Sequence, residues 1–418
     1  MDAHKSLTIG IFGFGVVGEG IYKVLQQTPS LKARIKKVCI KHPGKKRNAP
    51  AELFTTNKDD ILNDNEINVV VEVIDDPEAA FDIVSTALKN GKAVVSASKK
   101  MIADHLSQIL DMQKETGLPF LYEAAACASI PVIRNLEEYY DNDLLHSIKG
   151  IINGSTNFIL SKMFEDRLDF NQALMLAQQL GFAESNPSLD VEGFDAVNKW
   201  SILLNHAYGI VAHPDEILFT GIQNILLSDA VVAKEKQVDI KLVAQAKKLK
   251  NGKVAAFVLP QFIKHDDALS FVKYQYNGVV IESGFADKQF FYGKGAGSFP
   301  TASAVLSDLS ALRYDYKYEY KKLYHHAPNE LTNDYYVKVY VSFDDWSYIP
   351  RDKFQWIEEW HAEAERKYLV GVLHVNELRE SSWWKENRTS LVLTTEPIIE
   401  DFEVIKLKKR SLELAGVV

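Results

Sequence analysis

The first 147 residues alternate short apolar runs with longer amphipathic stretches. Each apolar run has the length of a strand, and the residues that follow it place apolar side chains at helical spacing. The expected strands cover residues 6–12, 35–42, 69–74, 93–98 and 120–125, and the expected helices cover 19–27, 77–90, 103–117 and 130–140. Strands that alternate with helices in this way predict an α/β domain over residues 1–147, with a Rossmann-type, doubly wound parallel sheet.

The pattern changes beyond residue 147. A strand-like run leads into a turn at Gly154, and helical spacing follows it and recurs to about residue 250. Strand-like runs return at 254–260, 270–276 and 278–281. These features predict an α+β domain over residues 148–292.

A glycine-rich loop with Gly293, Gly295 and Gly297 then enters a helix that has Pro300 in its first turn. One interpretation is that residues 293–315 return to the first domain, complete it and close over a cofactor. The alternative is a purely structural elbow.

The remaining residues predict a connector at 316–333 and a small α+β module at 334–418. The module begins with alternating tyrosines and valines at 336–341. The aromatic residues at 354–360 have helical spacing and predict an amphipathic helix, and two further strands are expected at 369–375 and 390–395.

Composition sets broad limits on function. With 418 residues, of which 46% are hydrophobic and 25% charged, the chain is long enough for two or three globular domains. The formal net charge of −8 argues against nucleic acid as the principal partner. No apolar run reaches membrane-spanning length and the first residues lack a signal-peptide profile, so we expect a cytoplasmic protein with no membrane association. The two cysteines, Cys39 and Cys127, have no C-x-x-C partner, which fits a reducing compartment and excludes a cysteine metal site.

A glycine turn joins the first strand to the first helix. Gly13 permits the tight turn, Gly15 lets the backbone approach a pyrophosphate, and Gly18 lets helix and strand pack closely. The order of strand, glycine turn and helix favours a dinucleotide-binding site over a structural turn.

Basic residues follow the second strand, where an NAD-selective site usually carries an acid for the ribose 2′-hydroxyl. Lys41 and His42 occupy this place, and Lys45, Lys46 and Arg47 follow. Cations suit a 2′-phosphate, so we expect NADP rather than NAD; a solvated basic turn is the alternative.

The segment at 181–199 contains several acidic residues and ends at a lysine, Lys199. Asp195 and Lys199 are four residues apart on a predicted helix and therefore share one face. One interpretation is an exposed ion pair on a capped helix. The other is a polar cup in which carboxylates hold a small cationic substrate while the lysine moves a proton.

Six motifs together resemble those of the homoserine dehydrogenase family, in the family's order, over roughly residues 6–312. They are G-F-G-V-V-G at 13–18, S-A-S-K-K at 96–100, E-A-A-A-C-A-S-I-P at 123–131, I-I-N-G-S-T-N-F-I-L at 151–160, the segment 181–199, and G-K-G-A-G-S-F-P-T-A-S-A-V at 293–305. The resemblance implies the interconversion of L-homoserine and L-aspartate 4-semialdehyde with NAD(P), a step of threonine, methionine and isoleucine synthesis.

The resemblance also assigns roles to single positions. Lys199 matches the family's proton-transferring lysine, Asp195 matches its carboxylate partner, and Lys99 matches a lysine near nicotinamide and substrate. Glu184 matches the residue that binds the substrate amino group. The remaining substrate positions are Asp190, Gly154 and Ser155. The expected cofactor contacts are Gly13, Phe14, Gly15, Val17, Gly18, Lys41, Arg47, Ser96, Lys99 and Gly295.

A monovalent-cation site of relatives, for Na+ or K+, matches Glu123 and the backbone at Ala126, Ala128 and Ile130. The chain departs from the family where Ala128 and Ser129 replace glycine-containing positions. It also has S-A-S-K at 96–99 in place of T-A-N-K, and two acids at 75–76 in place of a glycine pair.

Many relatives carry a regulatory ACT domain where the tail lies. Its usual D-x-P-G-V-L turn is replaced here by F-D-D-W-S-Y-I-P at 343–350. We therefore expect a diverged ACT-like or dimer-supporting module, a substrate and dimerisation role for residues 148–292, and a homodimer or higher oligomer. The alternatives are an oxidoreductase for another small amino-acid aldehyde and a catalytically silent sensor of nucleotide or amino acid.

Overall fold

The structure is a computed structural model that describes residues 5–142, 144–363 and 366–401. The chain divides into two compact units. Unit 1 comprises residues 1–143, 198–214 and 291–328, and unit 2 comprises 144–197, 215–290 and 329–418.

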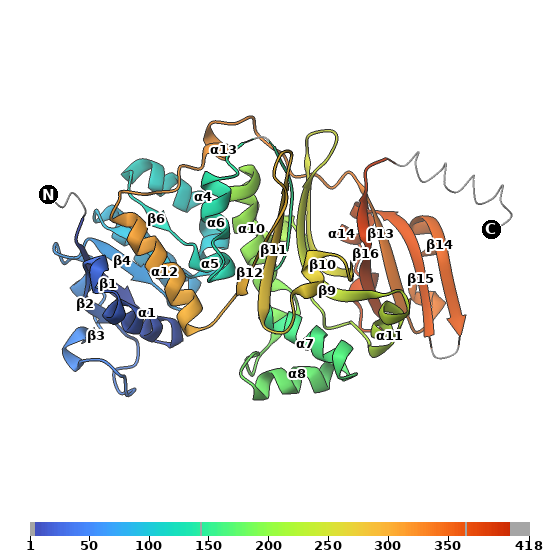
Figure 1. Ribbon diagram of the computed structural model, residues 1–418, viewed down its shortest axis with the longest axis horizontal. Helices are drawn as coiled ribbons and strands as arrows, with labels where there is room; N and C mark the ends of the chain where they lie inside the picture. The colour runs from blue at the N-terminus through green and yellow to red at the C-terminus, as the bar shows by residue number, and fades with distance from the viewer. Residues whose placement is uncertain (1–4, 143, 364–365, 402–418) are drawn as a thin grey trace. The chain divides into compact units, whose positions relative to one another are not determined.

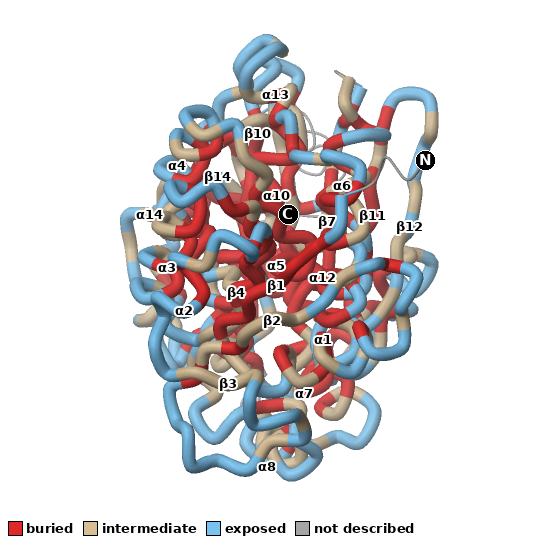
Figure 2. The backbone as a smooth tube through the Cα atoms, turned by 90° about the vertical axis from the view of Figure 1, so that its left-hand side faces the viewer, coloured by how far each residue is buried: buried red, intermediate tan, exposed pale blue. Residues whose placement is uncertain are grey.

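Unit 1 is built on a parallel sheet that has six strands within the described residues, in the order β3-β2-β1-β4-β5-β6. The strands are β1 (Leu7–Phe12), β2 (Ala33–Cys39), β3 (Phe54–Thr55), β4 (Val69–Glu72), β5 (Ala93–Ser96) and β6 (Phe120–Leu121). The central strands β1 and β4 are buried along their whole length (Figure 2). This order is that of the Rossmann fold, so the predicted doubly wound sheet is confirmed.

Helices connect and flank these strands. They are α1 (Val16–Gln27), α2 (Asp59–Leu62), α3 (Pro77–Lys89), α4 (Lys99–Thr116), α5 (Ala124–Cys127), α6 (Val132–Glu138), α12 (Ser298–Leu312) and α13 (Lys321–Tyr324). Helices α1 and α12 lie side by side (Figure 1), and the Ser298 hydroxyl donates a hydrogen bond of 2.8 Å to the carbonyl of Val16. The glycine-rich loop before α12 thus returns to the glycine turn before α1.

An extended segment at residues 316–320 packs into unit 1. Tyr318 and Tyr320, two residues apart, are only 3% and 4% exposed. The Tyr320 hydroxyl lies 3.0 Å from that of Tyr122, which in turn lies 2.9 Å from Nε2 of His206. In an extended segment successive side chains point to opposite sides. The tyrosines therefore face the protein interior, and the polar residues between them face solvent.

Unit 2 contains most of a ten-stranded sheet of described residues, ordered β12-β11-β7-β9-β10-β16-β13-β15-β14, with β8 paired to β10. The strands are β7 (Leu145–Ile151), β8 (Leu218–Phe219), β9 (Val238–Lys248), β10 (Val254–Lys264), β11 (Tyr276–Ser283), β12 (Asp287–Lys294), β13 (Tyr336–Phe343), β14 (Phe354–Glu363), β15 (Arg366–His374) and β16 (Thr389–Ile399). The helices are α7 (Gly154–Glu165), α8 (Phe170–Gln179), α9 (Ser188–Val191), α10 (Phe194–Tyr208), α11 (Leu227–Glu235) and α14 (Val375–Arg379). Helix α10 begins in unit 2 and ends in residues assigned to unit 1.

Three predictions of local structure are wrong. Helical spacing to residue 250 hides β9, whose apolar positions match that spacing although its backbone pairs with β7 and β10. The aromatic residues at 354–360 form β14, because pairing with β15 outweighs their helical spacing and aromatic residues suit strands. Residues 270–271 end a 3-10 helix (Ala268–Phe271), and residues 272–275 form a loop and a turn instead of a strand.

The C-terminal strands form an antiparallel arrangement with the order β16-β13-β15-β14. Short 3-10 turns at Trp346–Tyr348 and Arg351–Lys353 follow β13, at the place where the expected ACT-like module has its first helix. Asp229 of α11 joins this part to the rest of unit 2: its buried carboxylate accepts hydrogen bonds from Ser342 Oγ at 2.6 Å and Tyr340 Oη at 3.0 Å. Burial raises the pKa of Asp229.

Ala128 has φ 44° and ψ −107°, a conformation that favours glycine. We expect Ala128→Gly to stabilise the protein by about 1 kcal/mol, because relief of backbone strain exceeds the added entropy of the unfolded chain. Urea unfolding of the two proteins measures the difference. The control is Ala126→Gly in α5, which should destabilise by about 0.5–1 kcal/mol. Equal destabilisation by both changes would contradict the assigned strain.

Candidate functional site

The glycine turn of unit 1 is closed by contacts that admit no side chain. Gly13 has φ +99°, and a Cβ there would lie 2.7 Å from the carbonyl oxygen of Val73. A Cβ at Gly18 would lie 2.3 Å from the carbonyl oxygen of Gly13. Both positions therefore require glycine, as the dinucleotide-binding interpretation expects.

Gly15 has a different environment, since no heavy atom lies within 4 Å of the place its Cβ would take. It is the N-cap of α1 and offers no side-chain acceptor to the first N–H groups of the helix. Such N–H groups and the positive end of the helix dipole bind anions. Open space at this position therefore fits a cofactor pyrophosphate.

Phe14 and Val17 flank this turn. The Phe14 ring contacts the edges of Phe54 at 5.0 Å and Tyr22 at 6.0 Å between centroids, whereas Val17 is half-buried in the first turn of α1. Phe14 thus connects the turn to the wall of an adjoining cavity. Gly295 lies just beyond β12, on the loop that leads to α12.

This adjoining cavity, of about 500 Å³, opens beyond the carboxyl end of β2. Lys45, Arg47 and Phe54 line it, whereas Lys41 is exposed and is not among the lining residues. The Arg47 guanidinium donates hydrogen bonds of 2.7 Å to the carbonyls of Lys45 and His42, and its Nε is buried without a hydrogen-bond partner. Two cations and an orphaned N–H donor fit a phosphate group.

Glu72, at the carboxyl end of β4, is a buried acid that motif reasoning missed. Its carboxylate accepts hydrogen bonds from Ser96 Oγ at 2.6 Å, Ser98 Oγ at 3.1 Å and the amide of Ile74 at 2.7 Å. Burial raises the pKa of Glu72. An acid inside the apolar run V-V-V-E-V-I was the available signal.

Ser96 and Ser98 both donate to the Glu72 carboxylate, so Glu72 links the end of β5 to the start of α4. Ser98 is the N-cap of α4, and Lys99, half-buried, is the first residue of that helix. Lys99 consequently lies at the carboxyl edge of the parallel sheet, where ligands bind in such folds.

Of the two acids at 75–76, which depart from the family pattern, Asp76 has a local structural explanation. Asp76 caps α3 by accepting a hydrogen bond of 3.1 Å from the amide of Ala79, and Pro77 follows at the first helical position. Such a cap stabilises a helix by about 0.5–2 kcal/mol.

In unit 2, Asn153 holds two predicted acids together. Its Nδ2 donates to Asp190 Oδ1 at 2.7 Å and to Asp195 Oδ2 at 2.8 Å. Its Oδ1 accepts from the amide of Thr156 at 2.8 Å and so caps α7. Motif reasoning missed this role, although an asparagine directly before a glycine turn and a helix is a typical capping residue.

The turn after Asn153 is fixed by close contacts. A Cβ at Gly154 would lie 2.7 Å from the carbonyl oxygen of Gln275, so only glycine fits. The Ser155 hydroxyl donates a hydrogen bond of 2.7 Å to the carbonyl of Phe182. Glu184 is exposed on the loop between α8 and α9, and its backbone carbonyl accepts a hydrogen bond from Gln178 Nε2 at 2.9 Å.

Asp195 and Lys199 occupy one face of α10, one turn apart. Asp195 is 5% exposed and Lys199 is 6% exposed. The interpretation as an exposed surface pair is therefore wrong. Because burial of an ammonium is costly, a lysine at this position calls for a specific reason.

Glu123, the predicted cation ligand, caps a helix. Its carboxylate accepts from the amides of Ile133 at 2.8 Å and Arg134 at 2.9 Å. Burial, together with Asp308, raises the pKa of Glu123 to about 8. Over the described part of the chain, no group of three or more His, Cys, Asp or Glu side chains has the geometry of a metal site.

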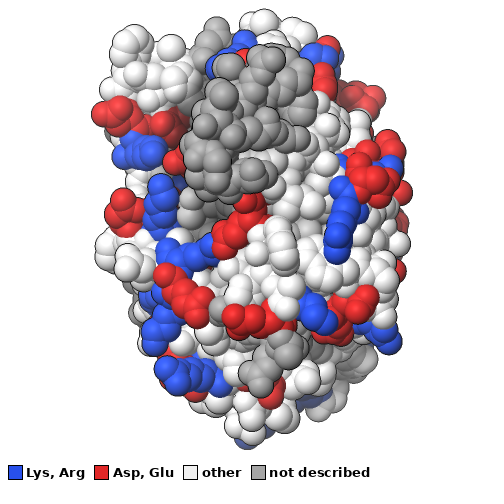
Figure 3. Space-filling view, turned by 90° about the vertical axis from the view of Figure 1, so that its right-hand side faces the viewer, with Lys and Arg blue, Asp and Glu red and all other residues white. Residues whose placement is uncertain are grey.

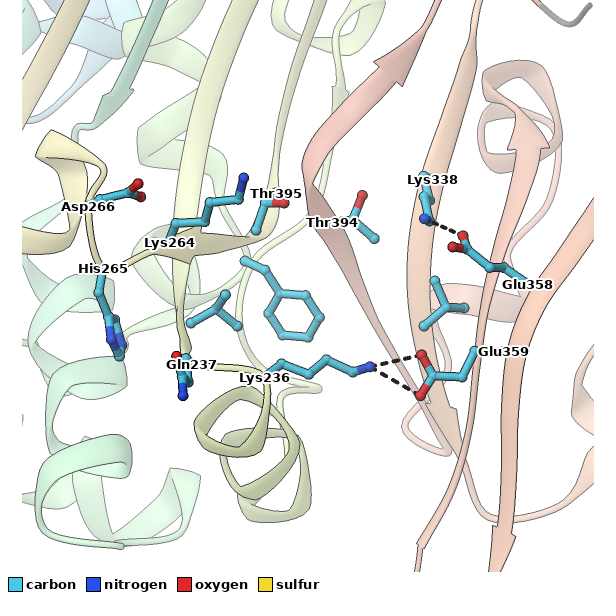
Figure 4. Close-up of a pocket in the computed structure, with 13 residues that line it drawn as sticks. Lys236, Gln237, Lys264, His265, Asp266, Lys338, Glu358, Glu359, Thr394 and Thr395 are labelled. Carbon is cyan, nitrogen blue, oxygen red and sulfur yellow. Dashed lines mark hydrogen bonds and ion pairs between the residues drawn. The ribbon is translucent and has the colours of Figure 1, made fainter. Parts of the chain in front are cut away.

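A further cavity, of about 560 Å³, belongs to unit 2 and lies against the C-terminal strands (Figure 4). None of the predicted site residues lines it. Lys236 pairs with Glu359 at 2.9 Å, and Lys338 pairs with Glu358. Its main cations are thus neutralised locally. Acidic and basic side chains are likewise intermixed on the face in Figure 3.

Among the residues that the structure describes, no helix combines the length and the apolar character that crossing a membrane requires.

Comparison with known families gives two matches. The family model for homoserine dehydrogenase matches residues 131–310, and the model for the NAD-binding domain of homoserine dehydrogenase matches residues 13–123. The homoserine dehydrogenase of Bacillus subtilis is 35% identical over 317 residues, covering 74% of this chain and 73% of the relative. That of Helicobacter pylori is 38% identical over 312 residues, covering 73% of each.

Solved structures agree with these matches. A homoserine dehydrogenase from Thiobacillus denitrificans has a TM-score of 0.81 and 27% identity, covering 93% of this chain and 98% of that one. A hyperthermophilic archaeal homoserine dehydrogenase mutant in complex with NADPH has a TM-score of 0.63 and 25% identity, covering 75% of this chain and 99% of that one. The glycine turn, the fold and these relatives together show that the chain belongs to the homoserine dehydrogenase family of NAD(P)-dependent oxidoreductases.

Proposed function

We propose that Lys199 transfers the proton in the family's reaction, the NAD(P)-dependent interconversion of L-homoserine and L-aspartate 4-semialdehyde. The observation that carries this proposal is a buried lysine one helical turn from Asp195, whose carboxylate is held by Asn153. A bound nicotinamide cofactor supplies or accepts the hydride. In the reducing direction the Lys199 ammonium donates a proton to the former aldehyde oxygen, and its charge stabilises the negative charge that develops there. In the oxidising direction the neutral amine accepts the hydroxyl proton.

The acids of unit 2 recognise the substrate ammonium in this proposal. Asp190 is fixed by Asn153 and Glu184 lies on an exposed loop, so Glu184 is the residue with freedom to close on a ligand. The Gly154–Ser155 turn, which carries no bulky side chain, admits the short substrate backbone. Lys99, which lies at the carboxyl edge of the parallel sheet, contributes a positive charge near the nicotinamide in this proposal.

NADP is the preferred cofactor in our proposal. Lys45 and Arg47 line the cavity beyond β2, and the orphaned Nε of Arg47 offers a donor to the 2′-phosphate. The archaeal relative in complex with NADPH supports this choice. Gly13, Gly15 and Gly18 hold the pyrophosphate at the start of α1, and Gly295 lies on the loop before α12.

We further propose a homodimer in the cytoplasm, with residues 1–147 and about 293–315 binding cofactor and 148–292 binding substrate. The outer strand β12 exposes Phe290 and Tyr292, at 40% and 49%, which supports self-association. Within the described residues neither Cys39 nor Cys127 forms a disulfide, which suits a reducing compartment. We do not propose a Na+ or K+ ion at Glu123, because both its carboxylate oxygens accept hydrogen bonds from backbone amides and burial raises its pKa to about 8.

Steady-state assays of the full chain test these points. Aspartate 4-semialdehyde and other small amino-acid aldehydes are supplied in turn with NADPH and with NADH. We expect the highest kcat/KM for aspartate semialdehyde with NADPH. Equal use of NADH would contradict the cofactor assignment, and tight nucleotide binding without turnover of any aldehyde would favour a silent sensor.

A further inference from the structure

Lys241 is a buried lysine outside the residues discussed so far. It lies in β9, on which α7 packs (Figure 1), and it is 2% exposed. Its Nζ donates hydrogen bonds of 2.9 Å to Asn157 Oδ1 and to the carbonyl of Val272. A long cationic side chain is therefore held inside unit 2 by two acceptors.

Asn157, in the first turn of α7, extends this network with the other end of its amide. Its Nδ2 donates to the carbonyls of Tyr274 at 2.8 Å, Val272 at 3.2 Å and Tyr276 at 3.3 Å. These carbonyls belong to residues 272–276, a loop that ends on the first residue of β11 and that we call the loop at 272–276. Its residues 272–275 were wrongly predicted as part of a strand. Lys241 fixes the orientation of the Asn157 amide, and the amide fixes the loop.

The same loop sets the position of the turn at Gly154. Its Gln275 carbonyl closes on Gly154 so tightly that a Cβ would lie 2.7 Å away. Asn153 precedes this glycine and holds Asp190 and Asp195. A shift of the loop would therefore displace both the glycine turn and the residue that orients the two acids.

We infer that Lys241 is a positioning residue for the substrate turn, acting through Asn157 and the loop at 272–276 on Gly154 and Asn153. This inference rests on the role proposed above for the Gly154–Ser155 turn. Lys241 itself touches neither substrate nor cofactor in this account. Its function is to supply N–H donors to buried oxygens that an apolar side chain would leave unsatisfied.

The surroundings explain why donation, rather than charge, is the function of this side chain. Burial, assisted by Lys273, lowers the pKa of Lys241 to about 7. Asp239 and Glu165 act in the opposite direction and, with Lys273, line a cavity of about 180 Å³ beside it. A neutral amine still carries two N–H groups, enough for both hydrogen bonds.

A double-mutant cycle tests the inference. Lys241→Met removes the donors and keeps most of the stem, and Asn157→Ala removes the amide. We expect each change to raise the KM for aspartate semialdehyde by about 2–30-fold, the range of coupling through packed networks, with the KM for NADPH unchanged. The double variant should be no worse than the more impaired single variant, because both act through one network.

Lys248→Met, a lysine to methionine change on the same strand, is the control and should leave both KM values unchanged. If Lys241→Met does not fold, Lys241→Gln, which keeps the site polar, takes its place in the cycle. Unchanged semialdehyde KM, additive effects, or an equal rise of both KM values would overturn the inference. Absence of semialdehyde turnover in the unmodified chain would instead overturn the proposed function.

Discussion

Replacing Lys199 with alanine is expected to lower kcat by about 10²–10⁴-fold, the usual contribution of a positioned general acid or base. The proton then has to come from water, and the charge developing on the substrate oxygen loses its buried cation. The KM for NADPH should stay within about 3-fold, because Lys199 is not among the residues assigned to the cofactor. Steady-state kinetics in both directions measure these values.

Lys58→Ala is the matched control, since this lysine is 53% exposed and pairs with Asp82 at 2.6 Å, away from the assigned site residues. It should leave kcat unchanged. Urea unfolding of both variants separates a lost proton donor from a lost fold. A Lys199→Ala protein that is folded and keeps near-normal kcat would remove this lysine from the mechanism.

Arg47→Ala is expected to raise the KM for NADPH by about 10–100-fold, the worth of one charged hydrogen bond to phosphate, with little change in the KM for NADH. The two cofactors differ only in the 2′-phosphate, so the NADH assay reports any distortion of the basic loop. That comparison is necessary because the Arg47 guanidinium also bonds to the carbonyls of Lys45 and His42.

Lys46→Ala supplies the control within the same loop, because Lys46 is exposed and is not a lining residue of the cavity. It should change neither cofactor's KM by more than about 2-fold. Equal losses with NADPH and NADH in Arg47→Ala would mean that the arginine supports the loop and does not select the cofactor.

The fold of unit 1 was predictable because its signals are local. Gly13 and Gly18 are positions where a Cβ would clash, and buried parallel strands read as continuous apolar runs. Strand β9 was not predictable in this way, since its pairing with β7 and β10 decides its conformation, while its apolar positions, interrupted by Lys241 and Gln245, also match helical spacing. In β14 the partner strand, which no local pattern reveals, decided the conformation.

The candidate site shows the same contrast between features that a local pattern predicts and features that depend on distant parts of the chain. Lys199 and Asp195 share a helix face, so their spacing was sufficient to pair them. The partners that orient such residues come from distant parts of the chain: Asn153 reaches Asp195, and Glu72 reaches Ser96. Lys241 and Asn157 are 84 residues apart, and neither carried a signal of the other. Motifs predicted the candidate site residues, and the fold showed which residues orient them through hydrogen bonds.

The most direct test of the account is a crystal structure of the chain with NADP and L-homoserine bound. We predict that Lys199 Nζ lies about 3 Å from the homoserine hydroxyl, or reaches it through one water molecule. A complex in which Lys199 faces away from that hydroxyl, while another side chain or none contacts it, would contradict the central claim.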